Sequence, residues 1–162
     1  MERRSRIGLI LLFAAALIPA EGVWAAVSVR VSGSWFETLD ETDLVGGAGS
    51  QLKSTIESAA DQVSITLLGA GNSSWRVDVR KVDTDWHGDL GLYVRRTSDG
   101  SGQGQIAGGT SYQQVTDTYQ EFFRGRKNCR DASLQLMLDG VSAELPCGNY
   151  LTTVYYTVVE VD

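Results

Sequence analysis

The sequence is poor in the residues on which metal clusters, catalytic triads and nucleic-acid surfaces depend. Its 162 residues include one His, two Cys and two Pro. One His and two Cys are too few for a His/Cys metal cluster. Lys and Arg number 14 against 20 Asp and Glu, which gives a formal net charge of −6. Because a protein that neutralises phosphates needs the opposite balance, nucleic acid is not an expected partner.

The motifs of common enzymes are also missing. The chain has no G-x-S-x-G, no H-E-x-x-H and no P-loop. The one His, His87, precedes Gly88 in an expected turn, where an exposed His fits better than a catalytic base. We therefore predict that the protein is not an enzyme. A small extracellular hydrolase with a carboxylate pair remains an alternative, because the acidic residues are many and their separation in space cannot be read from the sequence.

Residues 1–25 have the three parts of a secretory signal peptide. A basic start, M-E-R-R-S-R, is followed by an apolar run over 7–20 and by the small-residue cleavage site Val23-Trp24-Ala25. A run of this length is shorter than the roughly 20 residues that span a bilayer. We predict cleavage after Ala25 and a mature chain, 26–162, with no membrane span, which is secreted or held at the cell surface. In a Gram-negative bacterium it would pass through the periplasm. A retained N-terminal anchor is the alternative.

Export would place the two cysteines where a disulfide can form. Cys129 and Cys147 would lie in an oxidising compartment, where an even count favours pairing. The loop that they close has about 18 residues, and its closure contributes on the order of 3 kcal/mol in the chain-entropy model. The chain has no C-x-x-C motif and no His near either Cys, which argues against a catalytic thiol. The sequence therefore predicts a disulfide between them.

Apolar and polar residues alternate along most of the mature chain. Val27, Val29 and Val31, for example, are separated by polar residues. A period of two is typical of a strand with one buried face. The run 151–161 is β-branched and aromatic on both faces, which indicates a central strand. Strands are predicted over 27–31, 63–67, 75–79, 90–94, 134–138 and 151–161, with weaker ones over 112–115 and 119–123.

This pattern predicts an all-β fold. Short strands separated by glycine-containing turns indicate an immunoglobulin-like antiparallel β-sandwich of about seven to nine strands in a single domain, 26–162. The only helix that the sequence favours is a short one over 52–61, which its Ser and Thr residues weaken.

One turn gathers acidic residues and a tryptophan. Asp83, Asp85 and Asp89 lie within seven residues and offer oxygen ligands of the kind that calcium prefers. The spacing departs from the helix–loop–helix calcium pattern, because position 12 counted from Asp83 is Val94 rather than Glu. Trp86 lies in the same turn and, if exposed, could contact a glycan or a protein partner. A solvated acidic turn and a tryptophan packed over the sandwich edge are the simpler interpretations.

The end of the chain resembles a known kind of domain. The stretch Gly148-Asn-Tyr150-Leu-Thr-Thr-Val-Tyr-Tyr-Thr-Val-Val resembles the closing strand of secreted bacterial pilin-type and spore-coat-U-like domains, in which a G-x-Y turn leads into a Thr/Val/Tyr strand. The resemblance implies an immunoglobulin-like sandwich that lacks one strand and is completed by an extension of a neighbouring subunit. The chain departs from chaperone–usher pilins in ending Val161-Asp162, without a penultimate Tyr.

Together these features predict a secreted structural or adhesive surface protein. We expect a fibre subunit that assembles by strand exchange with copies of itself or with other surface proteins. The expected donor strand is the first of the mature chain, in which Val27, Val29 and Val31 would fill a groove; the alternative is that this strand pairs within its own sandwich. A monomeric carbohydrate- or calcium-dependent binding module, built on Trp86 and the acidic turn, is the alternative function.

Overall fold

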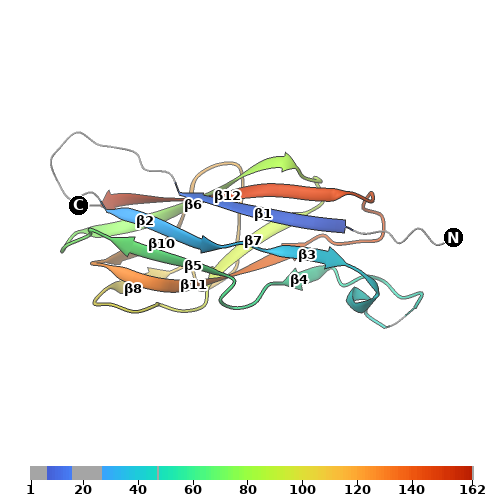
Figure 1. Cartoon of the computed structure of the whole chain (residues 1–162), viewed down its shortest axis with the longest axis horizontal. Coiled ribbons are helices and arrows are strands. Elements are labelled where there is room, and N and C mark those ends of the chain that lie inside the picture. The colour runs from blue at the N-terminus through green and yellow to red at the C-terminus, as the bar shows by residue number, and fades with distance from the viewer. Residues whose placement is uncertain (1–6, 16–26, 47, 162) are drawn as a thin grey trace.

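Two β-sheets enclose one hydrophobic core (Figure 1). The computed structural model describes residues 7–15, 27–46 and 48–161, with side chains from residue 27 onward. The strands are β1 (Ile7–Ala15), β2 (Ser28–Gly33), β3 (Phe36–Leu39), β4 (Thr55–Glu57), β5 (Val63–Leu68), β6 (Ser74–Asp85), β7 (Gly91–Arg96), β8 (Gln105–Gly108), β9 (Gln113–Gln114), β10 (Gln120–Arg126), β11 (Cys129–Asp139) and β12 (Asn149–Val161).

The first sheet, sheet A, has the strand order β3-β1-β12-β6-β10-β8. The second, sheet B, has the order β2-β5-β11-β7-β9, and β4 also pairs with β11. All described pairs are antiparallel except β1 with β12, which run parallel. The predicted all-β fold is confirmed, and each predicted strand overlaps an observed one.

The core is built from the inward positions of both sheets. On β5 the alternate residues Val63, Ile65 and Leu67 are completely buried, as the period of two predicts. Trp75 of β6 is completely buried too, and its indole Nε1 donates to the carbonyl oxygen of Lys127 at 2.7 Å. Burial of each such side chain contributes about 1.5–3 kcal/mol. The core therefore joins the two sheets along their length.

The helix expected over 52–61 is absent, and that prediction is wrong. The described residues contain no α-helix, only the 3-10 turn η1 (Glu41–Asp43). Thr55–Glu57 instead forms β4, in which Ile56 pairs with Leu138 of β11. Ser58 extends this pairing, because its backbone N–H donates to the Leu136 carbonyl oxygen and its Oγ accepts from the Leu136 N–H, each at 2.9 Å. Two β-branched residues and this pairing outweigh a weak helix propensity. No helix of the described segments has the length and apolar character needed to cross a membrane.

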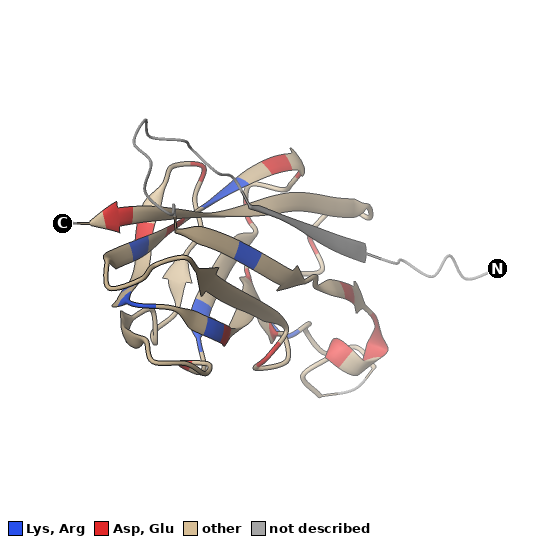
Figure 2. Ribbon diagram, turned by 60° about the vertical axis from the view of Figure 1, so that its left-hand side comes forward, with Lys and Arg blue, Asp and Glu red and all other residues tan. Residues whose placement is uncertain are grey.

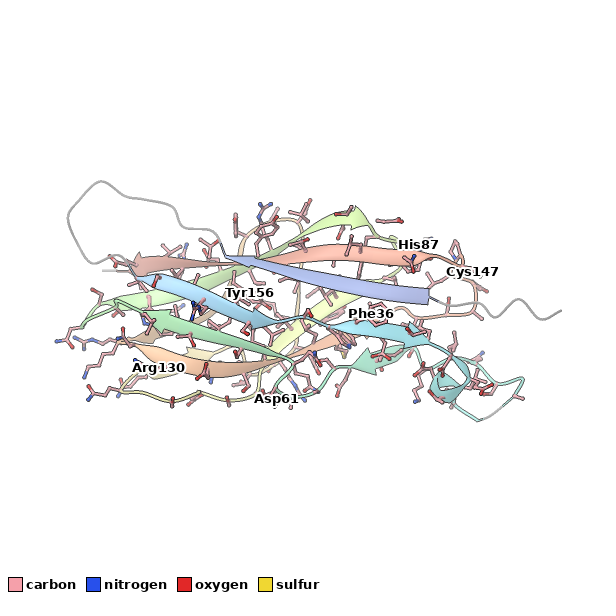
Figure 3. All side chains as sticks on the ribbon, viewed as in Figure 1. Phe36, Asp61, His87, Arg130, Cys147 and Tyr156 are labelled. Carbon is pink, nitrogen blue, oxygen red and sulfur yellow. The ribbon has the colours of Figure 1, made fainter. Side chains whose placement is uncertain are left out.

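The predicted disulfide is also wrong. Cys129 is the first residue of β11, and the 11 residues of that strand span roughly 35 Å. Cys147 follows beyond the far end of β11, so the two cysteines are not bonded to each other. Figure 3 shows Cys147 and Arg130, the neighbour of Cys129, at opposite ends of the molecule. Cys129 is buried, which raises the pKa of its thiol, and its Sγ donates to the Asp99 carbonyl oxygen at 3.2 Å.

Candidate strand-acceptor site

The position of β1 is the most informative feature of sheet A. Its backbone pairs with β12 from Gly8 opposite Asn149 to Ala15 opposite Tyr156. On its other side it pairs with β3, from Ile7 opposite Leu39 to Ile10 opposite Phe36. In Figure 1, β1 lies between β12 and β3, which are joined in the sheet only through it. The residues of β1 belong to the apolar run over 7–20 that the sequence assigns to a signal peptide.

Loss of residues 1–25 would therefore leave two strand edges facing a common gap. On the β12 side the gap is bounded by the eight residues that pair with β1, and on the β3 side by four. Cleavage after Ala25 remains a prediction, but its structural consequence is defined by this register. Unpaired edges of this kind invite pairing with another extended chain.

The wall of the gap on β12 is mostly apolar. Tyr150, Thr152, Val154 and Tyr156 alternate along the strand and are buried beneath the assembled sheet. Their register partners on β1 are the odd-numbered positions from 9 to 15. An occupying strand would thus place every second residue against this wall, as in strand addition. Burial raises the pKa of the Tyr156 hydroxyl far above its ordinary value, so this tyrosine stays neutral.

A pocket of about 360 Å³ continues the gap at one end. Leu39, the last residue of β3, forms part of its wall, and so does Cys147, which lies two residues before β12. The remaining lining is leucine-rich with an acidic rim: Asp40, Glu41, Leu44, Leu52, Ser142, Ala143 and Leu145. Both edges of the gap therefore lead directly into one pocket.

The acidic rim is held by local hydrogen bonds. Asp40 caps η1, and its Oδ1 accepts from the backbone N–H and the hydroxyl of Thr42, each at 2.8 Å. These bonds lower the pKa of the Asp40 carboxyl, which keeps it charged. Asp43 lies 4.0 Å from the ammonium of Lys53. Figure 2 shows acidic residues gathered around η1 at this end of the molecule.

The expected donor strand pairs within its own sandwich. β2 runs antiparallel to β5, from Ser28 opposite Leu68 to Gly33 opposite Val63, and forms one edge of sheet B. Val27 and Val29 are buried, and Val31 packs against the core with part of its surface exposed. This is the arrangement that the sequence left as an alternative. Exchange of β2 between copies stays a prediction.

The three acidic residues expected to bind calcium have different surroundings. Asp83 is contacted by Lys81 and accepts from the Thr152 hydroxyl at 2.7 Å. Asp89 lies 3.5 Å from Nδ1 of His87, and Asp85 ends β6. Within the part of the chain that the structure describes, no three His, Cys, Asp or Glu side chains form a group suited to a metal ion. Calcium binding at this turn stays a prediction.

Trp86 stabilises its own turn. The side chain is half-buried against the core, and its Nε1 donates to the Leu90 carbonyl oxygen at 2.8 Å. The Lys81 ammonium lies 5.0 Å from the centre of the indole ring. These contacts agree with the interpretation of a tryptophan packed at the sandwich edge, and a role in ligand contact stays a prediction.

Sequence reasoning missed the β3 side of the gap. β3 has only four residues, and one of them, Phe36, is 61% exposed, so no alternation stands out. The one usable signal is the spacing of Trp35 and Leu39, which are both buried. Comparison of the chain with protein-family models, curated proteins and solved structures gave no match.

Proposed function

We propose that the mature chain is a secreted structural or adhesive surface subunit whose immunoglobulin-like sandwich lacks one strand. Neighbouring subunits or surface proteins would supply that strand and so join into a larger assembly. The observation that carries the proposal is the place of β1, between β12 and β3, formed by residues with the composition of a cleaved leader. Removal of the leader would leave a strand-shaped gap in an otherwise continuous sheet.

The energetics favour refilling of this gap. An empty gap would expose side chains such as Tyr150, Val154 and Tyr156, which are buried beneath the assembled sheet. Each large apolar side chain that returns to the interior contributes about 1.5–3 kcal/mol. The incoming strand also satisfies backbone groups along two edges. The resemblance of the last strand to pilin-type and spore-coat-U-like domains supports the same mode of assembly.

The identity of the donor affects the cost of assembly. If β2 of another copy were the donor, it would have to break its six register pairs with β5. That exchange would open a second edge on sheet B of the donor. A donor segment that is unpaired before assembly avoids this cost, and the proposal does not depend on β2.

Peptide complementation tests the proposal. The protein would be collected from the exported fraction of cells that express the full chain, and its N-terminus would be identified by mass spectrometry. It would then be unfolded and refolded with or without a synthetic peptide of residues 7–15. We expect the peptide to bind and to raise the melting temperature by several degrees, because it restores the missing pairs.

Two variant peptides provide the matched control. Leu9→Asp, Leu11→Asp and Phe13→Asp place charges opposite the buried wall of β12 and should abolish binding. Charges at positions 10, 12 and 14 fall on the other face of the strand and should be tolerated far better. In parallel, negative-stain microscopy of the exported protein should show fibres. A stable monomer that retains residues 7–15, or whose melting temperature no peptide changes, would contradict the proposal.

A further inference from the structure

The pocket at the end of the gap has a composition that suits one kind of side chain. Its apolar wall includes Leu39, Leu44 and Leu145, and its rim carries the carboxylates of Asp40 and Glu41. A long cationic side chain matches this combination, because its methylene stem packs on apolar surface while its charged head stays at a polar rim. A purely apolar side chain would bring no positive charge to the carboxylates of the rim.

The register between β1 and β3 indicates which residue of an incoming strand would reach this rim. The β1 position of Ile7 lies opposite Leu39, and Asp40 follows Leu39 directly. Because β1 and β3 are antiparallel, an incoming strand in the same register would bring the residue before its first paired position toward Asp40. The residues just before the occupying strand, rather than those within it, therefore meet the acidic rim.

The charge around the pocket is strongly one-sided. The two segments that line it, 39–53 and 141–147, contain Asp40, Glu41, Asp43 and Glu144, and their one basic residue is Lys53. Lys53 is engaged with Asp43 and with the carbonyl oxygen of Thr42. Asp40 and Glu41 are both exposed. An incoming cation therefore meets an uncompensated negative field.

The sequence of the chain itself supplies a segment with the matching chemistry. Residues 7–15, which fill the gap in this structure, are preceded in the sequence by Glu-Arg-Arg-Ser-Arg. Basic residues followed at once by an apolar strand are thus compatible with the acidic end and with the gap together. Opposite charges across such a contact favour one register and one direction of entry.

We propose that this acidic pocket selects the partner of the gap. The partner segment is an extended stretch of another polypeptide in which Lys or Arg comes directly before alternating apolar residues, and which runs parallel to β12. This inference rests on the proposed function, and it adds a chemical identity for the occupant. The leucine wall holds the stem of the basic side chain, and Asp40 and Glu41 hold its head.

The test compares two peptides on the exported protein. One has the sequence of residues 3–15, and the other carries Arg3→Gln, Arg4→Gln and Arg6→Gln. We expect the basic peptide to bind about tenfold more tightly at low ionic strength, because charge pairs at an exposed rim are modest in strength. The difference should largely disappear at about 0.5 M salt, where such pairs are screened.

Variants of the protein test whether Asp40 and Glu41 cause the preference for the basic peptide. The double variant Asp40→Asn, Glu41→Gln should bind both peptides equally, and Asn keeps the cap of η1. Asp61→Asn is the matched control, since Asp61 is exposed and lies away from this end of the molecule (Figure 3). It should retain the tenfold preference.

The outcomes separate this inference from the proposed function. If neither peptide binds, the proposed function fails. If both peptides bind with equal affinity at low salt, strand complementation stands and selection by the acidic pocket is wrong. Selection by Asp40 and Glu41 is also wrong if the double variant keeps its preference for the basic peptide.

Discussion

Sheet B and sheet A differ in where their strands come from. Every described strand of sheet B lies between Ser28 and Asp139, within the predicted mature chain. Sheet A includes β1, from a segment that the sequence assigns to a leader. If residues 1–25 are removed, as the sequence predicts, the mature chain would still build sheet B completely, whereas sheet A would need a strand from elsewhere. The weak seam of the fold would then lie between β3 and β12.

The largest expected loss of stability comes from truncating a core side chain, and one such substitution in each sheet compares the two sheets directly. Leu134 is completely buried in β11, between β5 and β7. Leu134→Ala should destabilise the exported protein by about 2–5 kcal/mol whether or not the gap is filled. Val154→Ala, in the wall of the gap, should cost more when the peptide of residues 7–15 is bound than when it is absent. Denaturant unfolding with and without that peptide measures both.

An equal cost of Val154→Ala in the two states would argue against an open seam. In that case β12 would be buried equally well without an occupant. Sheet A would then not depend on an added strand for its stability, and the proposed difference between the two sheets would be wrong.

A smaller loss of stability is expected where the loop at Gly100 packs closely against the start of β11 in sheet B. Gly100 has φ +69°, and a Cβ there would lie 2.1 Å from the Arg130 carbonyl oxygen. Ser101 and Arg130 exchange backbone hydrogen bonds of 2.7 and 2.8 Å beside it. Gly100→Ala should therefore cost about 1–3 kcal/mol in thermal or denaturant unfolding. Gly71→Ala is the control, since its φ is +52° but no atom lies within 4 Å of the added Cβ. Equal losses would mean that backbone strain alone, without the close contact, accounts for the cost.

The smallest effect is a dependence on alkaline pH. Burial and the nearby Glu57 raise the pKa of Tyr112 from its ordinary value of 10.0 to about 12. The folded protein therefore holds this proton more tightly than the unfolded chain does. Its contribution to stability is fully present below about pH 10 and is lost as the pH rises toward 12. Tyr112→Phe should make unfolding curves measured across that window less dependent on pH, and an unchanged slope would contradict the shifted pKa.

The sequence predicted the strands whose alternation is regular and long. The runs at 63–67 and 75–79 became β5 and β6, and Trp75 is in the core as its phase indicates. The helix over 52–61 failed because weak local propensity gave way to pairing with β11. The disulfide failed because a spacing of 18 residues is largely taken up by the length of one strand.

The candidate site was harder to predict, for a physical reason. A leader and a buried strand are both short apolar runs, so composition alone does not show that 7–15 fits between β12 and β3. The acidic rim around Asp40 and the leucines that form the pocket are separated by up to about 100 residues in the sequence, and only the fold brings them together. Pattern reasoning predicted assembly by strand exchange, which stays a prediction, and it described a donor over 27–31 rather than an acceptor.

Hydrogen exchange along β12 tests the central claim most directly. The exported protein, unfolded and refolded as in the peptide experiment, would be labelled without and with the peptide of residues 7–15, and protection would be compared between β12 and β11. We expect that β11 is protected in both states, whereas the amides of 149–156 that face the gap gain protection only with the peptide. Full protection of these amides in a cleaved protein without any peptide or partner would contradict it.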